Sequence, residues 1–194
     1  MRELEERILK DGRVLPGEVL KVDNFLNHQV DPDLMFSIGT EFAHLFRDAG
    51  VTKILTVESS GIAPAVMTGL ALHVPVVFAR KHKSVTLIDD LFTAEVYSYT
   101  KKTSNHISIA KKFLDAGDKV LLIDDFLANG QAVQGLFEIC DQAKADVMGV
   151  GIVIEKVFQT GHQLVKDRGV RLESLAQITS FDDDRVHFAS EQTD

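Results

Sequence analysis

The sequence has 194 residues, of which 45% are hydrophobic, and a formal net charge of −8 at pH 7. This length suffices for the core of a domain of ordinary size, whereas the acidic balance argues against a nucleic-acid surface, which needs a basic face. The charged residues 1–7 exclude an export signal, and no stretch approaches the roughly 20 apolar residues of a membrane span. Because the single cysteine, Cys140, allows no internal disulfide, we expect a protein of the reducing cytoplasm with no membrane partner.

The first half of the chain predicts two helices and then a strand–helix–strand unit. A short amphipathic helix should stop at Gly12, and residues 14–30 should form a small cap or edge-strand piece. The pair Asp31-Pro32 opens a longer helix, which Gly50 ends. A strand at residues 53–57, a turn at 58–61, a helix at 62–72 and a strand at 74–79 follow, which is typical of parallel pairing with a right-handed crossover.

The second half predicts a hairpin and then more alternating strands and helices. Alternation at residues 93–99 indicates hairpin strands that flank a mobile loop. The acidic tail from about Ser180 should be loosely held. Further strands are predicted at 120–123, 147–154 and 170–176, with helices at 131–143 and 161–168. The predicted fold is α/β: a mostly parallel central sheet flanked by helices, with a flexible hairpin loop and a small N-terminal cap.

Two adjacent carboxylates, Asp124 and Asp125, follow an apolar run that predicts a strand buried on both faces. Open α/β sheets bind ligands at the carboxyl ends of their strands, which makes this pair a candidate site. Neighbouring like charges repel each other, and burying either charge is costly without a partner. Sugar hydroxyls and Mg²⁺, which takes oxygen ligands, would compensate both charges. An ordinary turn in which one aspartate caps the next helix is the alternative.

Two turns of small residues precede predicted helices. The first is Glu58-Ser59-Ser60-Gly61, and the second is Ala128-Asn129-Gly130-Gln131-Ala132, directly after the carboxylates. Small residues let backbone N–H groups approach a phosphate, and the helix dipole favours an anion. Each turn therefore predicts an anion site, although a plain helix start is the alternative for either turn taken alone.

The one dense basic region of this acidic chain lies around the predicted hairpin. Its members are Arg80, Lys81 and Lys83, with Lys101 and Lys102 further along. A polyanionic substrate would explain the contrast with the rest of the chain. For any single lysine, a solvated charged hairpin is the alternative interpretation.

The run from Val120 to Ala132 resembles the phosphoribosyl-pyrophosphate (PRPP) signature of the type I phosphoribosyltransferases. The whole chain is similar to the bacterial xanthine phosphoribosyltransferases. This resemblance implies one phosphoribosyltransferase domain over residues 1–194, with residues 1–30 contributing to a base-binding cap. It also implies a homodimer, a mobile basic loop that closes over PRPP, and Mg²⁺ bound mainly through PRPP without a dedicated protein cage.

The resemblance assigns roles to the motifs one by one. It implies that Asp124 and Asp125 hold the ribose hydroxyls as the catalytic pair, that the 128–132 loop holds the 5′-phosphate, and that the 58–61 turn holds the pyrophosphate. The chain departs from the family pattern at two positions of the loop. Ala128 replaces the aspartate of many relatives, which leaves the general base unassigned, and Asn129 replaces the usual threonine or serine.

The resemblance also implies a set of base-binding residues. Lys156 would donate to an exocyclic purine oxygen, and Asn27 would read a second carbonyl and a ring N–H. The alternative for Lys156 is an ordinary snorkelling surface lysine. The full set comprises Leu20, Asn27, Phe126, Lys156 and Phe158, with either phenylalanine stacking on the base.

The implied activity is purine salvage: transfer of 5-phosphoribosyl from PRPP to N9 of xanthine, giving xanthosine 5′-monophosphate and pyrophosphate. A lysine donor suits a 6-oxopurine and disfavours adenine. One alternative is the same reaction with guanine or hypoxanthine as the main substrate. Another is a non-catalytic PRPP-sensing regulator on the same fold, which would need a basic surface that a net charge of −8 does not favour.

Overall fold

The computed structural model describes residues 1–81, 90–98, 103–182 and 185–192. A six-stranded sheet runs through the molecule in the order β10-β9-β8-β7-β3-β4. All neighbouring pairs are parallel except β9 with β10, so the predicted mostly parallel sheet is confirmed. Its strands are β3 (Lys53–Val57), β4 (Val76–Ala79), β7 (Lys119–Leu127), β8 (Asp146–Lys156), β9 (Leu172–Asp182) and β10 (Arg185–Phe188).

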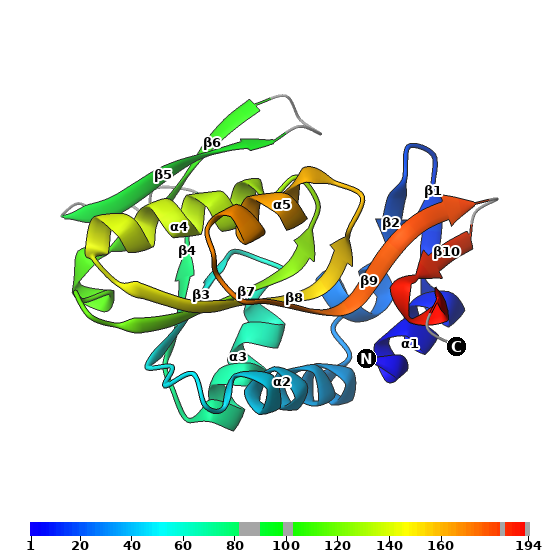
Figure 1. Ribbon diagram of the computed structural model, residues 1–194, viewed down its shortest axis with the longest axis horizontal. Helices are drawn as coiled ribbons and strands as arrows, with labels where there is room; N and C mark the ends of the chain where they lie inside the picture. Colours follow the sequence, from blue (N-terminus) through cyan, green and yellow to red (C-terminus); the bar gives the residue numbers. More distant parts are fainter. Residues whose placement is uncertain (82–89, 99–102, 183–184, 193–194) are drawn as a thin grey trace.

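Helices cover both faces of this sheet, as Figure 1 shows. One face carries α2 (Pro32–Phe46) and α3 (Ile62–Leu72), the other carries α4 (Gln131–Ala143) and α5 (Thr160–Asp167), and α1 (Arg2–Asp11) lies near β10. Strand β7 is apolar on both sides because Leu121 and Ile123 pack in the core with α2, whereas Val120 and Leu122 pack in the core with α4. No helix among the described residues is long and apolar enough to cross a membrane.

The N-terminal segment is tied to the start of α2. Asp31 caps this helix, because its Oδ1 accepts hydrogen bonds from the N–H groups of Asp33 (3.1 Å) and Leu34 (3.2 Å), with Pro32 as the first helical residue. Arg7 of α1 donates to the other oxygen of Asp31 at 2.7 Å. Between these helices lie β1 (Arg13–Leu15) and β2 (Val19–Lys21), which pair antiparallel, and a π-helical turn at Asp23–Asn27.

The predicted hairpin is confirmed as a separate antiparallel pair, β5 (Leu91–Ser98) and β6 (Thr103–Ala110), that lies over α4 (Figure 1). A 3₁₀ turn at Lys111–Phe113 follows it. Gly135 makes the close approach possible, since a Cβ at this position would lie 2.7 Å from Val96 Cγ2. Gln142 of α4 also donates to the backbone oxygen of Thr93 at 2.8 Å. The mobile loop expected beside the hairpin falls on residues 82–89 and 99–102, outside the described residues.

The expectation of a loose tail from Ser180 is wrong. Strand β9 continues to Asp182, β10 pairs with it antiparallel, and a 3₁₀ turn at Ala189–Gln192 follows. Phe188 is only 2% exposed and joins the core on the α2 face together with Val186. In β10 these apolar residues alternate with Arg185 and His187, which is a strand pattern that the acidic composition around it concealed.

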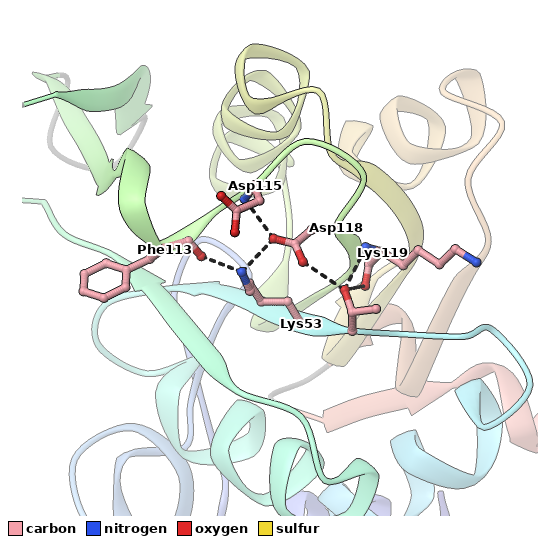
Figure 2. Close-up of polar contacts among 6 residues, drawn as sticks. Lys53, Phe113, Asp115, Asp118 and Lys119 are labelled. Atoms are coloured by element: carbon pink, nitrogen blue, oxygen red, sulfur yellow. Dashed lines mark hydrogen bonds and ion pairs between the residues drawn. The ribbon is translucent and has the colours of Figure 1, made fainter.

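A polar network joins segments at the amino ends of β3 and β7 (Figure 2). Lys53 Nζ lies 2.6 Å from Asp118 Oδ2 and donates to the backbone oxygen of Phe113 at 2.8 Å. Asp118 also accepts from the Asp115 N–H (2.9 Å) and the Thr52 hydroxyl (3.1 Å). Burial by itself would raise the pKa of Asp118, but the Lys53 ion pair and these hydrogen bonds lower it overall.

We predict that Asp118→Asn lowers the free energy of unfolding by about 2 kcal/mol at pH 7, because the Lys53 ammonium loses its anion. Asp118 has a lowered pKa in the folded state, so its stabilisation is present above the unfolded pKa and is lost as pH falls through the folded value. Urea denaturation at a series of pH values measures this. The difference between the two proteins should begin to shrink as pH falls below about 4, and a difference that persists undiminished into strong acid would contradict the prediction.

Candidate functional site

An open cleft of about 560 Å³ lies where β3 and β7 end. Its floor and rim come from the turn after β3, the end of β7, the loop before α4, and the β5–β6 hairpin. Many of the residues singled out from the sequence line it together: residues 58–60, Lys81, residues 124–126 and the whole 128–132 loop. The two small-residue turns and the acidic pair therefore surround one space, although the 58–61 turn lies more than 60 residues before the other two in the chain.

The acidic pair lies near the end of strand β7, which extends four residues further than the predicted strand. Asp124 is 6% exposed, and its Oδ1 accepts the N–H of Asp125 at 3.0 Å. Burial raises the pKa of Asp124 well above its usual range, and the neighbouring Asp125 charge raises it further. Burial also raises the pKa of Asp125, with Lys81 acting in the opposite direction. A ligand that supplies hydroxyl donors or a cation would therefore favour the ionised form of this pair.

The 58–61 turn lies close to the acidic pair. A Cβ at Gly61 would collide with Thr56 Oγ1 and lie 3.0 Å from Asp124 Oδ1, so only glycine permits this approach. The buried Thr56 hydroxyl has no hydrogen-bond partner among the described residues. The Glu58–Ser59 peptide bond is cis, and Glu58 Oε1 accepts the Lys81 N–H at 2.6 Å. Glu58 thus fixes the backbone of Lys81 at the rim of the cleft.

The 128–132 loop leads into α4 through Gly130, whose φ of +81° suits glycine. No side chain caps this end of α4, so the first N–H groups of the helix are available to an anion. Helix α4 has 13 residues, and its positive end adjoins the cleft that the loop lines. This arrangement can bind a phosphate group through backbone amides.

Sequence reasoning missed the contribution of the hairpin to the cleft. Val96 and Tyr97 of β5 and Asn105 and Ile107 of β6 line its wall. Alternation at residues 93–99 identified the hairpin, but not the helix on which it packs. The small residue Gly135 on α4 was the one local signal for that contact.

The structure does not bring every predicted residue of the basic region into the cleft. Arg80 lies beside it, with Nε 3.8 Å from Glu58 Oε2, and lines a separate hollow with Phe78 and Phe113. Lys83, Lys101 and Lys102 fall outside the described residues. Of this region, Lys81 is the residue that the structure places at the rim.

Two of the five predicted base-binding residues, Lys156 and Phe158, meet at the ring of Phe181. Lys156, at the end of β8, donates to the Glu18 carbonyl at 2.6 Å, and its Nζ lies 5.7 Å from the centroid of the Phe181 ring. Phe158 meets the same ring edge-on, with centroids 6.1 Å apart. Burial lowers the pKa of Lys156. Phe181 was missed because it lies in the segment that was expected to be loose.

The other three predicted base-binding residues are distributed around this group. Phe126 lines the cleft and pairs with Ile154 of β8, two residues before Lys156. Leu20 is buried in β2, and Asn27 is exposed at the end of the π-helical turn. Phe126 therefore joins the cleft to the Lys156 region.

Comparison with known proteins identifies close relatives. A xanthine phosphoribosyltransferase of Lactiplantibacillus plantarum is 89% identical over 193 residues, covering all of this chain and 99% of the relative. A second, from Ligilactobacillus salivarius, is 69% identical and covers 99% of this chain and all of the relative. No family model matches the chain.

Solved structures share the fold at low sequence identity. Adenine phosphoribosyltransferase of Trypanosoma brucei, in complex with AMP, pyrophosphate and ribose 5-phosphate, superposes with a TM-score of 0.74 at 22% identity, covering 93% of this chain and 82% of that one. Adenine phosphoribosyltransferase of Rhodothermus marinus gives a TM-score of 0.74 at 19% identity, covering 92% and 100%. These neighbours confirm the α/β fold predicted from the sequence.

We predict that Asp124→Asn stabilises the unliganded protein by about 1 kcal/mol at neutral pH, or roughly 3 °C in Tm. The raised pKa means that ionising this buried carboxyl opposes folding above the unfolded pKa, whereas below that value both states are protonated and the penalty disappears. Thermal unfolding at pH 7.5 and at pH 3.5 measures the difference. The gain should shrink on acidification, and a loss of stability at pH 7.5 would contradict the prediction.

Proposed function

The chain belongs to the xanthine phosphoribosyltransferase family, and from this premise we propose that it transfers 5-phosphoribosyl from PRPP to N9 of xanthine. The products are xanthosine 5′-monophosphate and pyrophosphate, and residues 1–194 act as one phosphoribosyltransferase domain. The observation that carries the proposal is the cleft in which one buried acidic pair lies between two turns suited to anions.

Each part of the cleft takes one part of PRPP. Asp124 and Asp125 accept hydrogen bonds from the ribose hydroxyls, which hold the sugar while its C1 gains positive charge. The 128–132 loop and the start of α4 bind the 5′-phosphate, and the 58–61 turn binds the diphosphate. Positioned amides and the Lys81 cation stabilise the charge that develops on the leaving pyrophosphate. The wall formed by β5 and β6 limits access of water to the reacting carbon.

Magnesium suits this site as a companion of PRPP. The described residues contain no group of three or more His, Cys, Asp or Glu side chains that could hold a metal by themselves. The carboxylate oxygens of Asp124 and Asp125, which line the cleft, are nevertheless the hard ligands that Mg²⁺ prefers, and Mg²⁺ often binds through one or two carboxylates plus substrate phosphates. When bound, the ion neutralises charge on the diphosphate.

The purine binds between Phe126 and Lys156, under the cap contributed by residues 1–30. Lys156 Nζ already donates to one carbonyl oxygen, that of Glu18 in the cap, and an exocyclic oxygen of xanthine supplies a second acceptor of the same kind. Asn27 and Leu20 complete the pocket from the cap, and Phe126 or Phe158 stacks on the ring. Because xanthine is the most acidic common purine, a nearby cation favours it.

The enzyme acts as a cytoplasmic homodimer without nucleic-acid or membrane partners. Exposed apolar side chains gather on α3 and near the edge strand β4, where Leu70, Phe78 and Phe113 are at least 40% exposed. Arg80 adjoins Phe78 and Phe113 and also approaches Glu58, so a second copy on this face would lie close to the cleft.

Sedimentation of Leu70→Asp tests this, because the variant should sediment as a monomer if the face is the interface.

The first experiment incubates the protein with PRPP and Mg²⁺ and offers xanthine, guanine, hypoxanthine and adenine separately. We expect nucleotide product mainly from xanthine, measured by chromatography. Product mainly from another oxopurine would retain the reaction and overturn the base assignment. Binding of PRPP without product from any base would favour a regulator, and normal PRPP affinity and rate in Asp125→Ala would refute the role of the acidic pair.

We predict that Lys156→Gln lowers kcat/KM for xanthine by about 100-fold, because a neutral amide cannot favour an acidic base through its charge. The KM for PRPP should change little, since Lys156 lies outside the residues that line the PRPP cleft. Steady-state kinetics with each substrate varied in turn measures both values. Lys10→Gln, on the exposed side of α1, is the control. An equal loss of affinity for PRPP would contradict this role of Lys156.

A further inference from the structure

Glu155 is a fully buried carboxylate that the proposed reaction does not use. It lies near the end of β8 with 0% of its surface exposed, and it is not among the residues that line the cleft. Its Oε1 is 2.5 Å from His162 Nδ1, and its Oε2 accepts from Gln177 Nε2 at 3.3 Å. A carboxyl oxygen and a ring nitrogen at this distance share one hydrogen bond, which joins the end of β8 to α5.

Burial of this carboxylate is not explained by stability alone. Removing a charged group from water is costly, and apolar residues of similar volume often stabilise a core as well as a buried ion pair does. A charge-assisted hydrogen bond does offer a defined geometry. The contact therefore suggests a role in holding His162, and the helix that carries it, in one position.

His162 lies in the first turn of α5, and this turn is in contact with the 128–132 loop. The Gly161 N–H donates to the Ala128 carbonyl at 2.9 Å, and the Thr160 hydroxyl donates to the Asn129 carbonyl at 3.4 Å. The Ala128–Asn129 peptide is thus oriented by α5. The N–H group of this peptide, that of Asn129, belongs to the 128–132 loop, to which the 5′-phosphate of PRPP is assigned.

The first turn of α5 and the 128–132 loop approach each other too closely to admit a side chain between them. A Cβ at Gly161 would lie 2.6 Å from the Ala128 carbonyl oxygen and 3.0 Å from the Gly130 nitrogen. A Cβ at Gly130 would lie 2.9 Å from the Gly161 Cα. Strand pairing adds a further link, since Leu127, which enters the loop, is opposite Glu155 in the sheet. A small shift of the first turn of α5 must therefore move the loop backbone.

We propose that Glu155 and His162 form a positioning pair that seats α5 against the 128–132 loop and so sets the loop's affinity for the 5′-phosphate of PRPP. This inference rests on the proposed function, which assigns the 5′-phosphate to that loop. The pair acts through the Gly161 N–H and the Ala128 carbonyl, and neither side chain touches the substrate.

The test compares two anionic probes in the full-length protein. Ribose 5-phosphate reports on the 128–132 loop, and pyrophosphate reports on the 58–61 turn. In Glu155→Gln we expect the Kd of ribose 5-phosphate to rise about tenfold and the Kd of pyrophosphate to stay unchanged, measured by isothermal titration calorimetry. The KM for PRPP should rise by a similar factor with little change in kcat, because the contact is made to the ground state and the transition state alike.

A control variant loosens the same helix from its other end. Asp141→Asn weakens the 2.8 Å ion pair between Arg168 and Asp141, which ties the end of α5 to α4 away from the loop. It should leave the binding of ribose 5-phosphate unchanged. His162→Gln is a second test variant, because His162 is partly exposed and its replacement disturbs the core less than a change at Glu155.

The outcomes separate the inference from the proposed function. Selective loss of ribose 5-phosphate binding in Glu155→Gln or His162→Gln supports the positioning pair. Equal weakening of both probes, or the same loss in Asp141→Asn, indicates general loosening and overturns it. Unchanged binding in both test variants overturns the inference while the proposed function stands, whereas a wild-type protein that binds neither probe and consumes no PRPP overturns both.

Discussion

The burial of two adjacent carboxylates at the end of β7 is the constraint on which the rest of the site depends. Asp124 and Asp125 are consecutive, and burial raises the pKa of each. Ionising them in the unliganded protein therefore costs free energy of folding. Sites of this kind are kept for function, because natural proteins accept local instability where a ligand relieves it. Gly61 and Lys81, which approach the pair, belong to the same arrangement.

Buried aspartates at the two ends of the sheet have pKa values that are shifted in opposite directions. At the amino ends of β3 and β7, Asp118 is paired with Lys53 and receives two further hydrogen bonds, so its pKa is lowered and its charge stabilises the fold. At the carboxyl ends, burial raises the pKa of Asp124, and the Thr56 hydroxyl has no hydrogen-bond partner among the described residues. Rigid attachment of the strands at one end thus supports an incompletely satisfied site at the other.

Sequence patterns predicted the elements that depend on interactions between residues close together in the chain. The apolar run of β7, the Asp31 cap with Pro32, and the small residues before α4 are each visible within a few residues, and the structure contains all three elements. The acidic pair could be placed at a strand end for the same reason. The turn at 58–61 followed from its position between a strand and a helix.

What the sequence concealed depends on contacts between distant segments. Phe188 packs in the core through the pairing of β10 with β9, and acidic neighbours hid this alternation. The hairpin reaches the cleft because Gly135 admits Val96 against α4, a contact that joins residues 39 positions apart. In the sequence, Glu155 follows an apolar run as the end of a strand would. Its contact with His162 forms only because α5 packs against β8 in the folded protein.

Under the proposed function, the placement of Lys156 links these long-range contacts to selectivity for the base. Its ammonium is half-buried at the end of the strand that also carries Glu155, and it bonds the Glu18 carbonyl while lying over Phe181 of β9. Burial disfavours its charged form, so an acceptor that is itself negative compensates this cost better than a neutral carbonyl does. A base that ionises readily, as xanthine does, gains most from such a lysine. In the two proposals, adjacent residues of β8 therefore serve the two substrates separately, with Glu155 acting on the phosphate loop through His162 and Lys156 acting on the purine.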